Sequence, residues 1–279
     1  IRMPEGVPDF VSQSFELIPV TLIVGGTFII LRFVFLNIIG ELPPSILTRF
    51  LTPLVGSMDN PWAVLMLNFC ICTIFFFGIH SSVFSPITRP IMVAFIAENI
   101  AAMQAGEPLP HFYTAGTSSA FFGFTGCGIS IGCIIACMMS KNKRYKQIGR
   151  VSLFPALFGI NEPILFGAPI ILNPIMFIPH VFGGAIIGTF PMFLMHWGLL
   201  NKPIFDPPYV GIFLEGFLTN GDWRTIIVCA IQLIASVAIY WPFFKIMERN
   251  DEIEAMEKAQ KAVFTQEEAK LLEDLDLDF

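Results

Sequence analysis

The chain has 279 residues, of which 54% are hydrophobic and only 14% are charged, and its mean hydropathy is +0.71. A water-soluble domain of this length carries more charge on its surface, so the composition excludes an ordinary soluble enzyme and predicts a protein embedded in a lipid bilayer. The net charge is −6, but half of the 22 acidic residues follow Met247 in an acidic tail, so nucleic acid is not an expected partner of either part.

Long apolar stretches recur along the chain. A spanning helix needs about 20 apolar residues, because the hydrocarbon core is about 30 Å thick and a helix rises about 1.5 Å per residue. Four stretches meet this requirement and a fifth leads into the tail: 17–39, 61–79, 120–139, 178–200 and 225–246. We therefore predict an all-α polytopic membrane protein with about five to six transmembrane helices, re-entrant hairpins and amphipathic interfacial helices.

Two segments between the spans carry isolated charges. PSILTRFLTPLVGSM, residues 44–58, has spaced apolar residues and a single Arg, which is typical of an amphipathic helix lying in the membrane interface. Residues 88–110 contain Arg89, Glu98 and Asn99. This segment is open to two interpretations, an interfacial helix or a helix buried against protein.

Residues 151–177 and 203–220 are apolar but interrupted by Pro and Gly. Unpaired backbone amides in lipid cost several kcal/mol each, so a broken apolar segment survives only where protein buries it or where it lines a cavity. We expect re-entrant hairpins or discontinuous helices here, and transporters place their binding sites at such breaks.

The basic cluster KNKRYKQIGR, residues 141–150, directly follows the third predicted span. Because cytoplasmic loops are enriched in Lys and Arg, we expect this loop in the cytoplasm. Lys245 and Arg249 predict the same side for the tail, which is expected to be exposed and partly helical or frayed.

Glu162 stands between Asn161 and Pro163 in the apolar run FGINEPILFGAPIILNPI, residues 158–175. A charged side chain at membrane depth costs at least about 2.5 kcal/mol, so such residues usually face a bundle interior or a watered cavity. Pro163 begins a helix well and Asn161 can cap one. A carboxylate accepts hydrogen bonds from two vicinal hydroxyls, which favours a neutral polyhydroxy ligand. The alternative is that Glu162 caps a helix or lies in a cytoplasmic loop.

His80 is the second isolated polar residue, at the end of the second predicted span in FFFGIHSSVFSP. An imidazole donates to or accepts from a hydroxyl and takes up a proton near neutral pH. The alternative is a satisfied histidine at an interface. His111, in EPLPHFYT, is expected in a loop and is a weaker candidate.

Motifs for metal, redox or soluble-enzyme chemistry are missing from the sequence. The six cysteines lie in apolar runs without a CxxC pair or a His at ligand spacing, which indicates reduced thiols. P-loop, GxSxG and HExxH patterns do not occur. We expect no metal and no cofactor.

Four motifs in chain order carry a family resemblance: MPEGVP (3–8), FFGIH (76–80), AAMQAGEPLPHFYT (101–114) and INEPILFGAPIILNPI (160–175). Together they resemble the enzyme IIC component of the bacterial phosphoenolpyruvate-dependent sugar phosphotransferase system, in particular its lactose and cellobiose (diacetylchitobiose) family. The likeness runs in order up to about residue 244.

Proteins of this family are longer, and their first half mainly builds a dimer interface, so the resemblance implies that this chain is a fragment corresponding to the latter part. It implies three regions: 1–60, the end of an N-terminal dimerisation domain with an amphipathic linker helix; 61–247, a substrate-binding transport domain with broken hairpins; and 248–279, an acidic cytoplasmic tail. It also implies a multi-pass protein of the bacterial inner membrane that forms a homodimer.

The resemblance further implies a permease that binds a disaccharide such as cellobiose, diacetylchitobiose or lactose. The permease would present the sugar to a cytoplasmic phosphorylated IIB partner, whose phosphocysteine donates the phosphoryl group. The chain would then be the membrane subunit of a protein-phosphohistidine-sugar phosphotransferase, and none of its own cysteines need carry the phosphoryl group.

By position, the resemblance implies that Glu162 holds the hydroxyl to be phosphorylated, that His80 lies beside it and that Asn161 braces the hairpin and contributes to binding. Polar residues after the first motif contact sugar in relatives, often as Asn, where this chain offers Ser12 and Gln13. Relatives commonly have a Trp in the second broken segment. Here NKPIFDPPYVG leaves Phe205 or Tyr209 as the aromatic platform.

Two other functional classes stay open on the residues alone. A proton- or ion-coupled secondary transporter would use Glu162 and His80 as a proton relay. A membrane receptor or assembly subunit without transport would make the hairpin structural. Phosphosugar as the delivered product would distinguish the first class from a symporter, which delivers free sugar.

Overall fold

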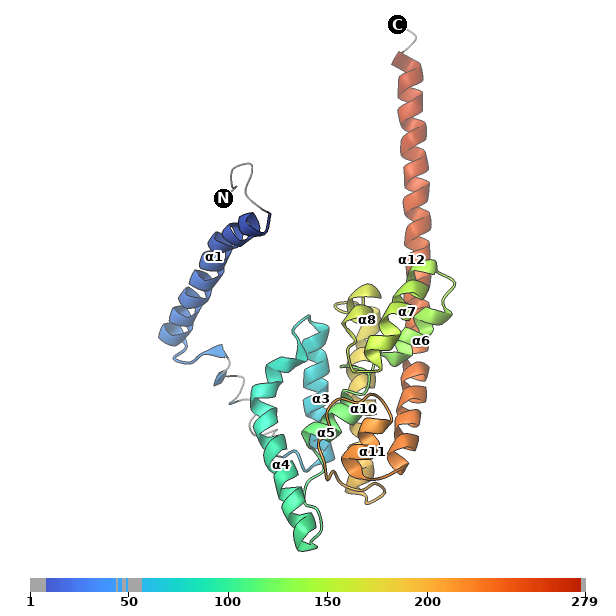
Figure 1. Cartoon of the computed structure of the whole chain (residues 1–279). Helices are drawn as coiled ribbons and strands as arrows, with labels where there is room; N and C mark the ends of the chain where they lie inside the picture. The colour runs from blue at the N-terminus through green and yellow to red at the C-terminus, as the bar shows by residue number, and fades with distance from the viewer. Residues whose placement is uncertain (1–8, 44, 47–48, 50–56, 277–279) are drawn as a thin grey trace. The chain divides into compact units, whose positions relative to one another are not determined.

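The computed structural model describes residues 9–43, 45–46, 49 and 57–276, with side chains described from residue 17 to residue 261 apart from 44, 47–48, 50–56 and 259. The described residues contain helices and no β-strand, in agreement with the predicted all-α class (Figure 1). The chain divides into two compact units, Ile1–Pro53 and Leu54–Phe279. The predicted functional division at residues 60 and 247 stays a prediction.

The first unit consists mainly of α1 (Asp9–Ile38), a helix of 30 residues that confirms the first predicted span. Its polar side chains satisfy themselves locally: the hydroxyls of Thr21 and Thr27 and the amide of Asn37 each donate to the carbonyl four residues earlier. Such bonds pair these three side chains within the helix, as an apolar surrounding requires. The amphipathic helix predicted at 44–58 falls largely outside the described residues.

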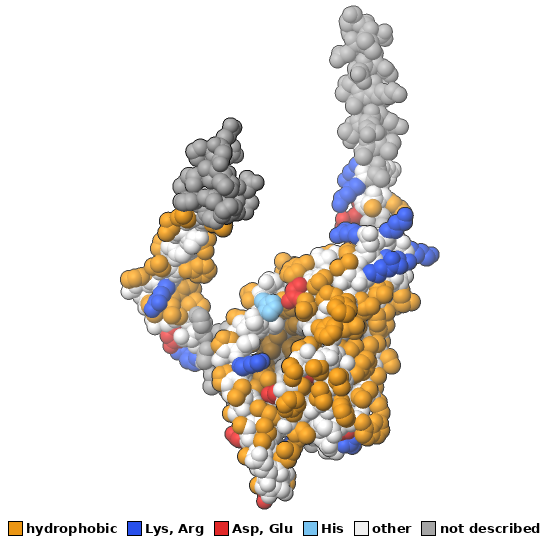
Figure 2. All heavy atoms as spheres, in the orientation of Figure 1, with side chains coloured by type: hydrophobic (Ala, Val, Ile, Leu, Met, Phe, Trp, Pro, Cys, Tyr) orange, Lys and Arg blue, Asp and Glu red, His pale blue; other side chains and the backbone are white. Residues whose placement is uncertain are grey.

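The second unit contains the other helices whose bounds the structure describes. In chain order they are α3 (Pro61–Phe76), η1 (Ser81–Phe84), α4 (Ser85–Ala105), α5 (Ala115–Thr117), η2 (Ser118–Phe122), α6 (Ile131–Met139), α7 (Lys143–Ala156), α8 (Glu162–Gly167), α9 (Pro174–Phe177), η3 (Ile178–Gly183), α10 (Gly184–His196), α11 (Leu214–Asn220) and α12 (Arg224–Asp276). Figure 2 shows apolar side chains over most of the visible face of this unit, with Lys and Arg gathered around the turn between α6 and α7 beside α12.

Three helices of the described residues are long and apolar enough to cross a membrane: Leu17–Ile38, Pro174–His196 and Arg224–Lys258. They match the predicted spans at 17–39, 178–200 and 225–246. The helix α3 covers the predicted span at 61–79 but has only 16 residues. Its start follows the expected chemistry, since Pro61 occupies the first turn and the side chain of Asn60 accepts the Trp62 N–H at 2.9 Å.

The predicted span at 120–139 is wrong as a single helix. The chain leaves helical geometry after Phe122 and resumes it only at Ile131. The sequence FGFTGCG supplies the break, and Gly126 has φ +83° and lies so close to the Asn161 amide that a Cβ there would be 2.2 Å from Cγ. Only glycine fits this conformation and this approach.

The broken segment is held by polar side chains of α12. Gln232, Ser236 and Tyr240 are spaced four residues apart on one face of this helix and are all buried. The Gln232 amide donates to the Phe121 carbonyl at 3.0 Å, the Ser236 hydroxyl to Ile129 at 2.6 Å and the Tyr240 hydroxyl to Gly128 at 2.9 Å. These bonds replace the intrahelical bonds that the break removes.

The predicted tail is continuous with α12, and most of its side chains up to Lys258 are exposed. The helix is tied to the α6–α7 region at its base, where the Glu248 carboxylate accepts from the Ser140 hydroxyl and the Asp251 carboxylate accepts from the Tyr145 hydroxyl. Lys245 also pairs with Glu248 at 2.7 Å. The acidic tail and the basic cluster therefore lie at the same end of the second unit.

We expect Gln232→Leu to destabilise the protein, because it leaves the buried carbonyls of Phe121 and Ile187 without their 3.0 and 2.9 Å bonds. Each buried group left unpaired costs about 1–3 kcal/mol. The measurement is the midpoint of thermal unfolding of the purified protein in detergent. Ile234→Leu, at an exposed position of the same helix, is the control and should keep the wild-type midpoint. An unchanged midpoint for Gln232→Leu would contradict the bracing role.

Candidate functional site

A cavity of about 500 Å³ lies within the second unit. Its wall combines the end of α3, the η1–α4 junction, the α5–η2 segment, the broken segment after η2 and the chain entering α8. Four of the residues singled out from the sequence line it: His80, Asn161, Glu162 and Tyr209. Segments far apart in the sequence therefore meet at the breaks between helices, as expected for a discontinuous membrane fold.

His80 and Glu162 face each other in this cavity, with Nε2 of His80 3.4 Å from Oε1 of Glu162. The Ser82 N–H donates to Nδ1 of His80 at 3.1 Å, so that nitrogen carries a lone pair and the proton of the neutral imidazole lies on Nε2. The imidazole donor therefore points toward the carboxylate. The side chains are 56% and 43% exposed, which leaves both open to a ligand hydroxyl.

Local chain geometry holds these two side chains together. His80 is the N-cap of η1 and its ring accepts the Ser82 N–H, and Glu162 begins α8 with Pro163 in the first turn. The Leu172 N–H donates to the Phe76 carbonyl at 3.1 Å, which joins the hairpin after α8 to the end of α3. The predicted helix start at Pro163 is thus confirmed.

Asn161 does not cap α8 with its side chain, contrary to the prediction. Its amide instead donates to the Cys127 carbonyl at 2.7 Å and to the Ser130 hydroxyl at 3.1 Å, and the residue is only 2% exposed. The backbone of the broken segment competes successfully for this amide because its carbonyls have no helical partner. Asn161 braces the two breaks against each other, and contact of Asn161 with sugar stays a prediction.

The two aromatic residues predicted as a sugar platform, Phe205 and Tyr209, lie in different places. Tyr209 lines the cavity, and its hydroxyl donates to the Gly123 carbonyl at 2.9 Å. Gly159, with φ +76°, makes room for it, because a Cβ there would lie 2.0 Å from the Tyr209 hydroxyl. Phe205 is half exposed and is not part of the cavity wall. Ser12 and Gln13 lie in the part of α1 whose side chains are outside the described residues.

Residues that the sequence reasoning did not assign to the site also line the cavity. Arg89 does so from the second turn of α4, and hydroxyl groups gather from three segments. These hydroxyls belong to Ser81, Ser82, Ser85, Thr88, Ser118 and Ser119. Ser118 and Ser119 come from the π-helical turn η2, a geometry that is frequent at functional sites. In the sequence, the only indication of these residues was that Arg89 is an isolated arginine in an apolar segment.

A second carboxyl group, that of Glu215 in α11, lies behind the cavity wall. Glu215 is 3% exposed, and its Oε1 atom has no hydrogen-bond partner within the described part of the chain. Burial raises the pKa of Glu215 to about 7, against which a bond from Ser119 acts. The helix α11 is not one of the membrane-spanning helices. Sequence reasoning missed this carboxyl because it named only Phe205 and Tyr209 in that segment.

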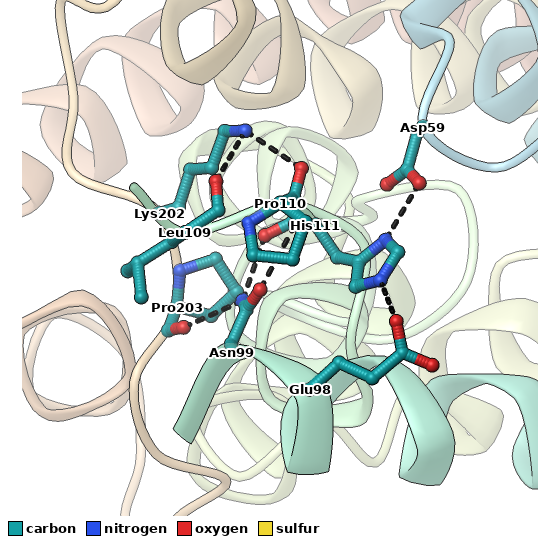
Figure 3. A network of polar contacts seen from close by, with 8 residues as sticks. All are labelled: Asp59, Glu98, Asn99, Leu109, Pro110, His111, Lys202 and Pro203. Carbon is teal, nitrogen blue, oxygen red and sulfur yellow. Dashed lines mark hydrogen bonds and ion pairs between the residues drawn. The ribbon is translucent and has the colours of Figure 1, made fainter. Parts of the chain in front are cut away.

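The chain entering α5 is fixed by a polar network around His111 (Figure 3). The two ring nitrogens of His111 lie 2.6 Å from carboxylate oxygens of Asp59 and Glu98, and Phe95 stacks on the ring at 3.9 Å. A carboxylate therefore lies within hydrogen-bond distance of each ring nitrogen and fixes the orientation of the ring. His111 lies in a loop, as predicted, and its ring contacts hold that loop against α4 and Asp59.

Asn99 completes this network from within α4. Its amide donates to the carbonyls of His111 at 2.7 Å and Pro203 at 2.9 Å, and its oxygen accepts the His111 N–H at 2.9 Å. Lys202 adds two bonds of 2.7 Å to the carbonyls of Leu109 and Pro110. Of the two interpretations of residues 88–110, burial against protein is correct at Asn99.

The arrangement suits a neutral polyhydroxylated ligand. A carboxylate accepts hydroxyl protons, an imidazole N–H and several hydroxyls donate or accept, and Tyr209 adds an aromatic ring. The volume of about 500 Å³ falls in the range of small-molecule sites, which is about 300–1,000 Å³. Among the described residues, no group of His, Cys, Asp and Glu side chains is arranged to hold a metal ion.

Comparison with known proteins places these features in context. The family model "Phosphotransferase system, EIIC" matches residues 1–184. The galactose-specific EIIC component of Lactococcus lactis subsp. cremoris (strain MG1363) is 30% identical over 94% of this chain and 58% of its own length. The lactose-specific EIICB component of Staphylococcus aureus is 34% identical over 89% of this chain and 44% of its own length. The chain therefore spans about half the length of these curated relatives.

A solved structure gives the same result for the fold. The crystal structure of the transporter ChbC, the IIC component from the N,N'-diacetylchitobiose-specific phosphotransferase system, matches with a TM-score of 0.66 at 26% sequence identity. The match covers 92% of this chain and 61% of that chain.

We expect the stability of the protein to fall between pH 5 and pH 8 because of Glu215, whose raised pKa of about 7 favours the neutral carboxyl in the folded state. This stabilisation is complete below the ordinary pKa of 4.5 and is lost as the pH rises through 7. Unfolding midpoints in detergent at both pH values provide the measurement. Glu215→Gln should flatten the pH dependence, whereas the exposed Glu107→Gln should not. Parallel profiles for wild type and Glu215→Gln would refute the assignment.

We expect Asn99→Leu to lower both stability and ligand affinity. The change unpairs the carbonyls of His111 and Pro203 and the N–H of His111, each at a cost of about 1–3 kcal/mol, and loosens the segment that carries Ser118 and Ser119 to the cavity. Thermal unfolding and sugar binding are measured together. Asn250→Leu, at an exposed position of α12, is the control, and equal midpoints for the two variants would show that the network does not support the wall.

Proposed function

Because this chain belongs to the phosphotransferase-system EIIC family, we propose that it is part of the sugar-translocating membrane subunit of such a system. The proposed substrate is a disaccharide such as cellobiose, diacetylchitobiose or lactose. The subunit binds the sugar, moves it by alternating access and presents it to a phosphorylated IIB partner. The names of the relatives, which include galactose-specific, lactose-specific and diacetylchitobiose-specific proteins, support this substrate class.

The observation that carries the proposal is the meeting of His80 and Glu162 at 3.4 Å in a cavity built from helix breaks. The carboxylate accepts the proton of the reactive hydroxyl and raises its nucleophilicity, and the imidazole N–H donates to a neighbouring sugar oxygen. Tyr209 offers an aromatic face for a pyranose ring. The chemistry requires only a donor phosphoryl group that reaches the held hydroxyl.

The orientation and the protein partners belong to the same proposal. The basic side chains around the α6–α7 turn, within residues 141–150, form the cytoplasmic docking surface for the IIB partner, and the acidic tail lies in the cytoplasm. One relative is named an EIICB component, which supports a IIB partner for this chain as well. The whole protein is proposed to form a homodimer in the bacterial inner membrane.

A proton-coupled secondary sugar transporter is the second candidate, and one observation favours it. Glu215 is a buried carboxyl group beside the cavity residues Ser119 and Tyr209, and its pKa of about 7 would allow it to exchange a proton near neutral pH. The two candidates differ in their products. The phosphotransferase delivers phosphosugar and needs phosphorylated IIB, while the symporter delivers free sugar and responds to the pH gradient.

We expect Glu162→Gln to weaken sugar binding by about tenfold or more, because hydrogen bonds to a charged group contribute about 1.5–3 kcal/mol. Binding of radiolabelled cellobiose, diacetylchitobiose and lactose to the purified protein is measured in mutual competition. His80→Ala is expected to weaken binding or lower the rate of phosphate transfer from phosphorylated IIB.

Glu107→Gln is the matched control, since Glu107 lies in the loop after α4 and is not part of the cavity wall. Sugar binding that survives Glu162→Gln with normal phosphorylation would contradict the proposed role of the carboxylate. Accumulation of unphosphorylated sugar driven by a pH gradient would favour the symporter instead.

A further inference from the structure

Arg89 is a cation without a counter-ion in the cavity wall. Within the described part of the chain no ion pair involves it, whereas Arg49 and Arg224 each pair with a carboxylate. The acidic residue of its own helix, Glu98, is already bonded to His111. Arg89 is exposed at the cavity, and Glu162, the carboxylate of the same cavity, faces His80. A guanidinium that is open to the cavity and has no ion-pair partner is suited to bind an anionic ligand.

Two hydroxyl groups accompany Arg89 on one surface. Ser82, Ser85 and Arg89 follow one another at spacings of three and four residues through η1 and α4, which places them along one face of the turn. All three line the cavity, and all three also line an adjoining hollow of about 810 Å³. The guanidinium therefore stands at the border between the sugar cavity and a second accessible space.

This group of donors matches a phosphate ester in charge and geometry. A phosphomonoester carries about −1.5 to −2 charges at pH 7 and three strong acceptor oxygens. A guanidinium binds two of these oxygens with parallel N–H groups, and a hydroxyl donates to another. A free sugar is neutral and needs no cation, so Arg89 is not explained by sugar binding alone.

The Ser82 hydroxyl lies 2.9 Å from Nδ1 of His80 and orients that ring, which leaves the Ser85 hydroxyl as the donor beside Arg89. We infer that Arg89, together with the hydroxyl of Ser85, forms a phosphoryl-binding subsite that holds the phosphate ester formed on the sugar at Glu162 and His80. The inference rests on the proposed function, and it adds a second ligand class, the anionic product, to the site. It also assigns to Arg89 the neutralisation of the negative charge that the phosphoryl group carries during the transfer.

In that transfer the sugar hydroxyl oxygen forms a bond to phosphorus while the bond from phosphorus to the cysteine sulfur of the phosphorylated IIB donor breaks. The hydroxyl proton passes to the Glu162 carboxylate, and the thiolate leaves on the donor. No other co-reactant is needed. Arg89 lines the same cavity as Glu162 and His80, and its role in the proposed transfer is to neutralise the negative charge on the three phosphoryl oxygens, which is the main contribution that proteins make to phosphoryl transfer.

The test compares two ligands of the purified protein: the disaccharide that binds most tightly and its phosphomonoester on the primary hydroxyl. Both compete against the radiolabelled disaccharide in wild type, Arg89→Gln, Arg89→Lys and the control Arg249→Gln, which alters an exposed arginine of α12 that is not part of the cavity wall. Phosphate transfer from phosphorylated IIB is followed in a single turnover.

We expect Arg89→Gln to raise the Kd of the phosphomonoester by at least about tenfold more than the Kd of the free sugar, and to slow the single turnover. Arg89→Lys should recover part of the loss, because it keeps the charge but not the bidentate geometry. Arg249→Gln should behave as wild type in the binding assay.

If Arg89→Gln raised the Kd of the phosphomonoester and the Kd of the free sugar by the same factor, Arg89 would only anchor the start of α4, and the subsite would be overturned. A wild-type protein that binds free sugar but not the phosphomonoester would overturn it as well, with the proposed function intact. Failure of every free disaccharide to bind wild type would instead refute the proposed function, and the subsite with it.

Discussion

The requirement that every backbone polar group be paired in an apolar surrounding governs this structure. Unpaired amides and carbonyls cost several kcal/mol each where water is absent. The chain nevertheless breaks its helices between Phe122 and Ile131 and again around α8. The breaks persist because buried side chains supply the missing partners: Asn161 from the hairpin, and Gln232, Ser236 and Tyr240 from α12.

The candidate site depends on these paired breaks. The first break contributes Gly123, Gly126 and Cys127 to the cavity wall, and the second contributes Asn161 and Glu162. The broken geometry brings Glu162 and His80 to one cavity, while the Ser82 N–H orients the imidazole toward the carboxylate. The side chains that pair the breaks and those that face the cavity therefore belong to one connected arrangement, in which Asn161 bonds the broken segment and also lines the cavity.

Charge is distributed unevenly around this arrangement. Most charged side chains of the second unit have partners, as with His111 between Asp59 and Glu98 and Lys245 beside Glu248. The cavity wall contains two further charged side chains, Glu162, which faces His80, and Arg89, for which no ion pair is found among the described residues. Both are exposed to the cavity, so they are the charged groups of the candidate site that are open to a ligand.

Much of the fold class could be predicted from the sequence. Composition and the length of the apolar stretches determine an all-helical membrane protein, and three of the predicted spans correspond to spanning helices, because hydropathy over about 20 residues reports directly on the bilayer. The isolated residues Glu162 and His80 were identifiable for the same reason, since a polar side chain in an apolar run is conspicuous. The motif resemblance added the family, which the comparisons confirm.

Only the tertiary structure decided where the helices break and which polar side chains serve the breaks. Hydropathy is the same for a continuous helix and for a broken one whose amides are paired by distant residues, so the span at 120–139 was mispredicted. The bonds that decide the matter join residues about a hundred positions apart, as between Ser236 and Ile129. For the same reason the sequence alone did not place Arg89 in the cavity wall, Glu215 next to the cavity residue Ser119, or Phe205 outside the cavity wall. Hydropathy and motifs report on what a residue is, whereas the cavity depends on which distant segments meet.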